Sequence, residues 1–489
     1  MSALGLGHVI TVLTQLLLPP AFLAVYGMER YGEWLVLSAA VGYLGALDFG
    51  LQTYTTNELT ILYHRGERQR FHQLQSVGLW LTLGLILAGT VLALLAFILP
   101  VELWLKIAWS HGQTAQVLFW LALQLLASIA MGNLNGLYRV VSQAHRAAMW
   151  GNCSKILSLT VTLAAVGLGS ALQHIALLQF LVLLVCIGFI LVDLSRVCPA
   201  ISPSLRYWNR ALAVGVLKPS FFFAFFVLNN FLIFQAPLLL LNRFFGPATV
   251  VTFTIGRSLF SFVRQVVAMF QHSLAPEITR LYGFGDTPKL ARVLTLVETL
   301  VLTTSLVAGV GMLVLSPQVL KVWLGRPELF DFWLYLLLML VTTVMNLKDC
   351  KLYLQYFTNN HIAAALLSTG SYLAVLWVCW YLVPISGPLG FMAAWLVVES
   401  AQLAWAHLFN IRLLAGARGR DFRSLIRLSL VLMATTVALY LSRPFLTDQA
   451  ALVQGLGALV AMGAVSFVCY FMFNLSGIIS ECKTQWQRV

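Results

Sequence analysis

Residues 248–282 read ATVVTFTIGRSLFSFVRQVVAMFQHSLAPEITRLY, a stretch that is long and apolar enough to cross a membrane. Arg257 and Arg264 lie inside this stretch instead of at its ends. Their spacing is close to two helical turns, so both guanidinium groups leave the helix on nearly the same side. Ser261 lies near that side and, with the polar pair at 271–272, extends it into a polar stripe.

Two arginines are unfavourable at this depth in a bilayer. A charge at the middle of a membrane helix costs about 2.5–3.5 kcal/mol, and such residues face a bundle interior or a water-filled cavity. One interpretation is that the arginines pair with carboxylates or backbone carbonyls of neighbouring helices. The interpretation that we favour is that Arg257, Arg264 and Ser261 bind an anionic ligand.

The composition of the whole chain indicates an all-α integral membrane protein. Of its 489 residues, 60% are hydrophobic and only 10% are charged, which excludes an ordinary soluble protein. A span needs about 20 predominantly apolar residues, and a pass along the chain predicts about fourteen transmembrane helices on this criterion. The predicted spans are 4–26, 32–62, 74–99, 114–138, 152–170, 174–194, 213–242, 248–276, 293–316, 330–357, 362–383, 389–412, 425–441 and 451–474.

The net charge of +13 is distributed as expected for a membrane protein. With the N-terminus in the cytoplasm, most of the 30 basic residues fall on inner loops and their flanks, Lys155 among them. This is the positive-inside bias that sets topology. It predicts anionic lipid headgroups, and not nucleic acid, as partners of the surface charge.

An internal repeat predicts the arrangement of the spans. Transporters often contain such repeats, and here six spans separate the two copies, so both have the same orientation. We therefore predict two pseudo-symmetric six-helix lobes at 1–200 and 213–413, two additional helices within 425–474 and a cytoplasmic tail at 475–489. A constant offset of 219 residues aligns Gly27 with Gly246, Glu58 with Glu277, Leu62 with Leu281, Tyr63 with Tyr282, Gly66 with Gly285 and Glu67 with Asp286.

Asp48 is predicted to lie near the bilayer centre, in the middle of the second span. Carboxylates in spans often serve proton relays, so Asp48, with Glu58, is a candidate site for a coupling proton or sodium ion. The alternative for Asp48 is a helix-to-helix hydrogen bond or a salt bridge to one of the arginines. Gln52 and Asn57 are too polar for lipid and are predicted to line the inner end of a substrate cavity.

Lys348 and Lys351 lie in the tenth predicted span, one helical turn apart and therefore on one face. They are candidates both for cavity lining, with substrate binding, and for interfacial anchoring, in which the ammonium group reaches the headgroups. Glu298 and Glu399 are lone carboxylates in the ninth and twelfth spans, and either is a candidate to compensate the arginines.

The sequence offers no pattern typical of an enzyme or of a bound cofactor. Its seven cysteines show no paired spacing, so neither a disulfide framework nor a zinc site is predicted. No metal-ligand spacing, nucleophile elbow or phosphate-binding glycine loop is present. We therefore expect no catalytic residues, no metal and no cofactor beyond a coupling ion.

The sequence VYGMERYGEWLVLSAAVGYLGALDFGL at 25–51, together with LYGFGD at 281–286, resembles bacterial polysaccharide transporters of the O-antigen flippase type. These belong to the multidrug/oligosaccharidyl-lipid/polysaccharide (MOP) flippase superfamily. The resemblance implies two six-helix bundles that face a central cavity, often with two extra helices, and it places Arg257 and Arg264 where relatives carry cationic cavity residues. The peptidoglycan-precursor branch tends to carry arginine on its first helix; here that helix offers only His8, Thr11, Thr14 and Gln15.

This resemblance predicts a flippase and not an enzyme. Its cargo would be an undecaprenyl-diphosphate-linked O-antigen or exopolysaccharide repeat unit, moved by alternating access from the cytoplasmic to the periplasmic leaflet for lipopolysaccharide or other polysaccharide biosynthesis. We expect a monomer in the bacterial inner membrane, beside a polysaccharide polymerase. The alternatives are a cation-coupled multidrug exporter of the same superfamily, in which acidic cavity residues should dominate, and a membrane glycan polymerase or ligase, which needs catalytic carboxylates or a large loop.

Overall fold

The computed structural model describes residues 3–48, 50–197, 203–273, 285–357 and 362–414, with a few isolated residues besides. Every regular element within these ranges is helical, which confirms the all-α class. Eight of the described helices are long and apolar enough to cross a membrane, as expected of a multi-pass membrane protein. The two additional helices predicted within 425–474 and the tail at 475–489 lie outside the described residues.

The chain divides into two compact units, Met1–Thr252 and Phe253–Val489. The division falls inside one helix, α10 (Pro247–Ser273). The lobe boundary predicted between residues 200 and 213 comes earlier in the chain and stays a prediction.

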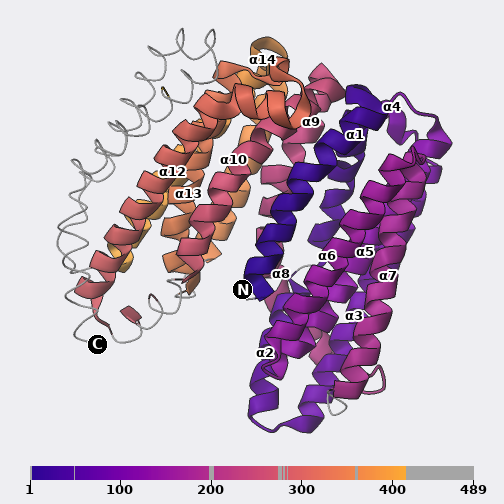
Figure 1. The fold of residues 1–489 in the computed structure, drawn as a ribbon. Helices are drawn as coiled ribbons and strands as arrows, with labels where there is room; N and C mark the ends of the chain where they lie inside the picture. The colour runs from indigo at the N-terminus through magenta and orange to yellow at the C-terminus, as the bar shows by residue number, and fades with distance from the viewer. Residues whose placement is uncertain are drawn as a thin grey trace. The chain divides into compact units, whose positions relative to one another are not determined.

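The first unit contains nine helices and two short 3-10 turns among its described residues. Its core forms where α5 packs on α7, α3 and α2, while α1 packs on α6 (Figure 1). Tyr138, Val77 and Ile190 lie in this core without exposure. The elements are α1 (Ala3–Val41), η1 (Gly42–Asp48), α2 (Leu51–His64), α3 (Arg68–Leu94), η2 (Leu95–Phe97), α4 (Val101–Leu105), α5 (His111–Val140), α6 (Ala144–Gly167), α7 (Leu172–Val197), α8 (Arg210–Phe234) and α9 (Ala236–Phe245).

The prediction of one continuous helix over 32–62 is wrong, because the structure has two helices there with a break between them. Helix α1 ends at Val41, a 3-10 turn follows, and α2 begins only at Leu51 after Gly50, whose φ of 64° lies in the left-handed region. Glycine adopts that conformation without the steric cost that other residues meet. Asp48 is thus the last residue of η1, at the break, and not a residue in the middle of a continuous helix.

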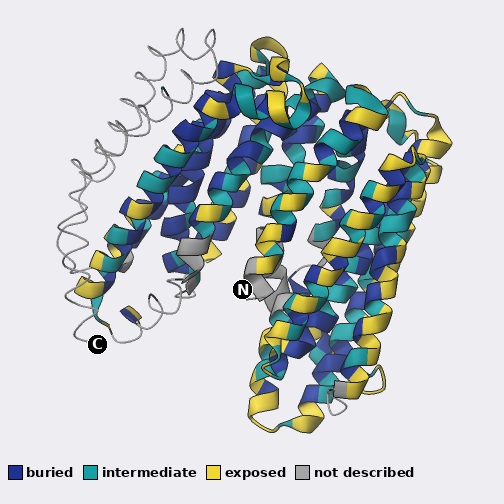
Figure 2. Cartoon of the chain, in the orientation of Figure 1, coloured by how far each residue is buried: buried dark blue, intermediate teal, exposed yellow. Residues whose placement is uncertain are grey.

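The second unit is built from three long helices that follow α10. These are α12 (Thr287–Leu324), α13 (Phe332–Phe357) and α14 (Ile362–Leu413), with a short turn, η4 (Pro327–Leu329), before α13. Helix α13 packs against both α12 and α14 and is the most buried of the eight candidate spans (Figures 1 and 2). Gly387 (φ 68°, ψ −168°) kinks α14 between the spans predicted at 362–383 and 389–412.

The backbone repeats at the offset that the sequence shows. Gly27 (φ 73°, ψ −178°) and Gly246 (φ 81°, ψ 177°) have nearly the same conformation, each at a junction between helical segments. The turns at Gly66 and Gly285 also match, with φ of 74° and 70°. Because these angles are accessible to few residues other than glycine, their recurrence supports the duplication.

The helices that follow these turns begin alike. Glu67 precedes α3 and forms a 3.0 Å salt bridge with Arg70; Asp286 precedes α12 and forms a 3.2 Å salt bridge with Lys289. The Lys289 backbone N–H also donates to the Asp286 side chain, which holds the pKa of that carboxyl below its usual range. The two helices thus share an ion pair between the residue before the helix and the one three positions on, while only Asp286 also caps its helix with a side-chain hydrogen bond.

Candidate functional site

The polar side of α10 is the feature that the sequence singled out, and the structure preserves it. Arg257, Ser261 and Arg264 are each partly exposed, whereas residues on the opposite side of the helix are buried. Gly256 lies on the buried side, where a Cβ would come within 3.2 Å of the Tyr335 ring on α13. This glycine lets α10 approach α13 closely. Between Thr254 and Gln265 the partly exposed side chains are Thr254, Arg257, Ser258, Ser261, Phe262, Arg264 and Gln265, all polar except Phe262.

Arg264 has a carboxylate partner on the neighbouring helix. Its Nη2 atom lies 3.4 Å from Oδ2 of Asp349 on α13, and its Nη1 lies 4.0 Å from the sulfur of Met345. Each side chain of the Arg264–Asp349 pair is 29% exposed. The guanidinium group of Arg257 lies 5.5 Å from the centre of the Phe253 ring, a cation–π contact along the same helix.

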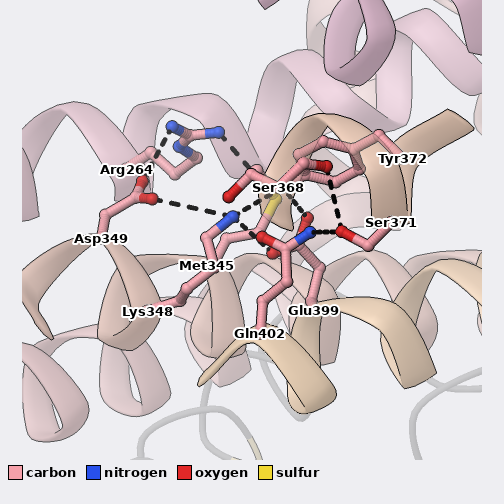
Figure 3. A network of polar contacts seen from close by, with 9 residues as sticks. All are labelled: Arg264, Met345, Lys348, Asp349, Ser368, Ser371, Tyr372, Glu399 and Gln402. Atoms are coloured by element: carbon pink, nitrogen blue, oxygen red, sulfur yellow. Dashed lines mark hydrogen bonds and ion pairs between the residues drawn. The ribbon is translucent and has the colours of Figure 1, made fainter. Parts of the chain in front are cut away.

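Lys348 lies at the centre of a buried network between α13 and α14 (Figure 3). Its Nζ atom is 2.7 Å from Oε2 of Glu399 and donates to the Tyr372 hydroxyl at 2.6 Å. That hydroxyl in turn donates to Oε1 of Glu399 at 2.8 Å, which closes the triangle. The Lys348 and Glu399 side chains are only 3% and 0% exposed, so the structure encloses this ion pair almost completely.

Lys351 forms a second buried pair, one turn further along α13. Its Nζ atom lies 2.8 Å from Oε2 of Glu298 on α12 and 3.1 Å from Nδ1 of His407 on α14. The two lone carboxylates of the sequence, Glu298 and Glu399, are therefore salt-bridged to lysines. An interfacial lysine extends its ammonium group toward water, whereas Lys348 and Lys351 hold theirs between helices.

Asp349 joins the polar side of α10 to the buried network. One of its carboxylate oxygens faces Arg264, and the other lies 3.9 Å from Nζ of Lys348 (Figure 3). Sequence reasoning assigned no role to Asp349 or to Tyr372. The adjacent charges of Lys348 and Asp349 were visible in the sequence, but consecutive helical residues point about 100° apart, so their neighbours depend on how the helices pack.

The predicted residues of α2 belong to the first unit and are not among the nine residues of the network in Figure 3. Gln52 and Glu58 are partly exposed, and Asn57 is exposed. Asp48 precedes them in η1, but its side chain lies outside what the structure describes. The substrate-binding role of Gln52 and Asn57 and the ion-coupling role of Asp48 and Glu58 stay predictions.

Lys155 occupies a different position from the one predicted. The sequence placed it on the flank of an inner loop, but α6 begins at Ala144, so Lys155 lies near the middle of the helix. Its Nζ atom donates to the hydroxyl of Thr11 on α1 at 3.3 Å. The early start of α6 was missed because its first residues are polar and resemble a loop.

Metal-binding groups are not evident in the part of the chain that the structure describes: no cluster of three or more His, Cys, Asp or Glu residues there could hold an ion. The four described cysteines, Cys153, Cys186, Cys350 and Cys379, are free thiols.

Comparison with known proteins identifies the fold. No family model and no curated sequence matches the chain. The lipid II flippase MurJ, in its inward closed conformation, superposes with a TM-score of 0.69 at 13% identity, and the match covers 95% of this chain and 98% of that one. An inward-facing multidrug resistance MATE family transporter of the MOP superfamily gives 0.61 at 15% identity, with 83% and 100% covered.

A third solved structure, a complex of the MATE multidrug transporter DinF-BH, gives a TM-score of 0.59 at 15% identity, with 83% of this chain and 93% of that one covered. The expected likeness to the MOP superfamily is thereby confirmed at the level of fold. The chain has the fold of the flippases and transporters of that superfamily.

Proposed function

We propose that this protein is a flippase for an undecaprenyl-diphosphate-linked oligosaccharide, an O-antigen or exopolysaccharide repeat unit. It moves this cargo by alternating access from the cytoplasmic to the periplasmic leaflet of the bacterial inner membrane. The observation that carries the proposal is the partly exposed side of α10, with two arginines in a span.

A diphosphate headgroup is the chemistry that this side of α10 fits. Guanidinium groups present paired N–H donors in one plane, which match phosphate oxygens better than the point charge of lysine does. Ser261 lies between Arg257 and Arg264 and is also partly exposed, so it offers a hydroxyl to the same ligand. The polyprenyl chain remains in the bilayer throughout, and only the polar head has to pass the protein.

The buried lysines serve this site indirectly. Lys348 and Lys351 were candidates for substrate binding, but each already faces a carboxylate at less than 3 Å. We propose that these pairs hold α12, α13 and α14 together and that contact with the cargo falls to the residues of α10. In the first unit, Gln52 and Asn57 are proposed to contact the glycan, and Asp48 and Glu58 to take up a coupling proton or sodium ion.

Multidrug export is the second candidate, because the similar solved structures include several MATE transporters. A site for cationic compounds should offer unpaired carboxylates. Here Glu399 and Glu298 are salt-bridged to lysines, and Asp349 faces Arg264. The charges on the described part of the second unit therefore favour an anionic cargo. Glycan polymerisation or ligation is the least favoured, since the similar structures are transporters and flippases.

The test is the distribution of polyprenyl-linked lipids in cells depleted of this protein. Mass spectrometry identifies the lipids, and an impermeant glycan-modifying reagent reports which leaflet they occupy. We expect one complete lipid-linked glycan to accumulate on the cytoplasmic leaflet and to disappear when the wild-type protein is restored. An unchanged lipid pool would instead favour drug export, and an incomplete glycan would point to glycan assembly.

A further inference from the structure

Asp349 is the one carboxylate in Figure 3 that lies between two cations of different exposure. Arg264, on one side, is 29% exposed and belongs to the polar side of α10. Lys348, on the other side, is 3% exposed and already holds Glu399. Asp349 itself is 29% exposed, so one of its neighbours can be reached from outside the helix bundle and the other cannot.

The two ion pairs of this network differ in how easily they can be exchanged. Where a water-filled cavity reaches it, a partly exposed pair stabilises little, because water solvates its charges almost as well as the partner does. The 3.4 Å separation of Arg264 from Asp349 is also longer than a close charge-assisted hydrogen bond. A buried pair such as Lys348–Glu399 resists disruption, since removal of one partner leaves an uncompensated charge in an apolar medium. An incoming anion would therefore displace Asp349 from Arg264 and leave the buried pair intact.

We propose that Asp349 is a competing anion that makes Arg264 selective for diphosphates. The proposal rests on the flippase function and specifies how its site chooses cargo. In the empty protein the carboxylate occupies Arg264. A diphosphate, with more charge and more acceptor oxygens than a carboxylate, displaces it on binding. Asp349 then keeps a weaker contact with the ammonium group of Lys348, 3.9 Å away, which it shares with Glu399.

Competition from Asp349 would keep anionic phospholipids from occupying the cationic site. Anionic phospholipids surround the protein at high concentration, and one such as phosphatidylglycerol offers a single negative charge to an arginine. A phospholipid that must displace a carboxylate of equal charge gains little by binding. The return of Asp349 to Arg264 also helps to release the cargo, because the arginine is never left without an anion. Asp349 is thus a positioning and specificity residue that need not touch the cargo.

The test compares lipid binding by the purified full-length protein and by its Asp349→Asn variant. The probe is undecaprenyl diphosphate, and the competitor is phosphatidylglycerol. We expect Asp349→Asn to bind the probe about 1.5-fold to fivefold more tightly, the factor that corresponds to loss of an exposed ion pair. Phosphatidylglycerol should compete strongly with the probe in this variant and weakly in the wild type. In cells, the variant should transport more slowly despite its tighter binding.

Asp286→Asn is the matched control, because Asp286 forms a salt bridge with Lys289 at the start of α12 and is not part of the network. Thermal unfolding and gel filtration establish that each variant is folded. If Asp349→Asn is not folded, the same binding measurements are made on Asp349→Ala. Equal affinity and equal phospholipid competition in a folded variant and the wild type would overturn the role of Asp349 while leaving the flippase standing. A wild-type protein that fails to bind undecaprenyl diphosphate would overturn the flippase proposal itself.

Discussion

At the scale of single residues, the charged side chains of the network in the second unit form a buried set and a partly exposed set. The buried pairs resist disruption, whereas the partly exposed pair can be exchanged for a ligand. Lys348 and Lys351 lie one turn apart on α13, and each pairs with a carboxylate from a different neighbour, Glu399 on α14 and Glu298 on α12. The two lysines therefore tie three helices together. Arg264 and Asp349 form the partly exposed set beside them.

Glu399→Gln is expected to destabilise the protein by about 3–5 kcal/mol, because it leaves Lys348 buried without a counter-charge. The double variant Lys348→Met/Glu399→Gln should recover most of this loss, since it removes both charges. Chemical denaturation in detergent micelles measures both. Glu67→Gln is the matched control: it breaks the exposed pair with Arg70 and should change stability by less than about 1 kcal/mol. Equal destabilisation by the single and double variants would contradict this account of the pair.

Arg264→Gln and Arg257→Gln are each expected to abolish transport, whereas the corresponding lysine variants should only weaken it. Glutamine removes the charge that is proposed to bind phosphate, and lysine retains the charge but loses the planar pair of donors. The amount of surface polymer in cells reports transport, with protein levels checked by immunoblot. Lys321→Gln, an exposed residue at the end of α12, should have no effect. Normal polymer in the double glutamine variant would refute the binding role of the arginines.

At the scale of elements, the repeated glycines are positions where the backbone itself is constrained. Gly246→Ala is expected to destabilise the protein by about 1–3 kcal/mol, because its φ of 81° and ψ of 177° are strained for any residue with a Cβ. Gly84→Ala, in the middle of α3 with no atom within 4 Å of the added Cβ, should instead stabilise by about 0.4–1 kcal/mol. Thermal unfolding shows whether each variant is more or less stable than the wild type. Destabilisation of similar size at both positions would argue against the backbone explanation.

Hydrophobic runs and the offset of the repeat were sufficient to predict the class of fold. The break between α1 and α2 was not predictable from them. Glycine is common in membrane helices, so Gly42 and Gly50 did not distinguish a broken helix from a continuous one. The second copy of the repeat has no such break. At the offset of 219 residues, the stretch that corresponds to the break between α1 and α2 lies within α10, which is continuous from Pro247 to Ser273.

The polar side of α10 was predictable because helical spacing alone puts Arg257, Ser261 and Arg264 together. The pairing of Lys348 with Glu399 was not, since those residues lie on different helices whose register only packing decides. The start of α6 was missed for a related reason. The polar residues that begin α6 resemble a loop in sequence, and only the packing of α6 on α1 shows that they are helical.

At the scale of the whole molecule, the fold is compatible with more than one cargo, because flippases and drug exporters share it. A fold alone therefore does not decide function, and the charge of the cargo must be inferred from the site. An anion that moves out of a bacterium is favoured by about 2.3 kcal/mol per charge for each 100 mV of membrane potential. The potential alone would thus drive a diphosphate-linked cargo outward.

Asp48→Asn tests whether an ion gradient adds to this drive. In proteoliposomes, wild-type transport should respond both to an imposed membrane potential and to a pH or sodium gradient. If Asp48 carries the coupling ion at the break between η1 and α2, its variant should keep the response to potential and lose the response to the gradient, because asparagine cannot exchange a proton or neutralise a cation. Glu102→Gln, which alters a carboxylate in α4, should retain both responses. An Asp48→Asn variant that still follows the gradient would assign the coupling ion to another residue.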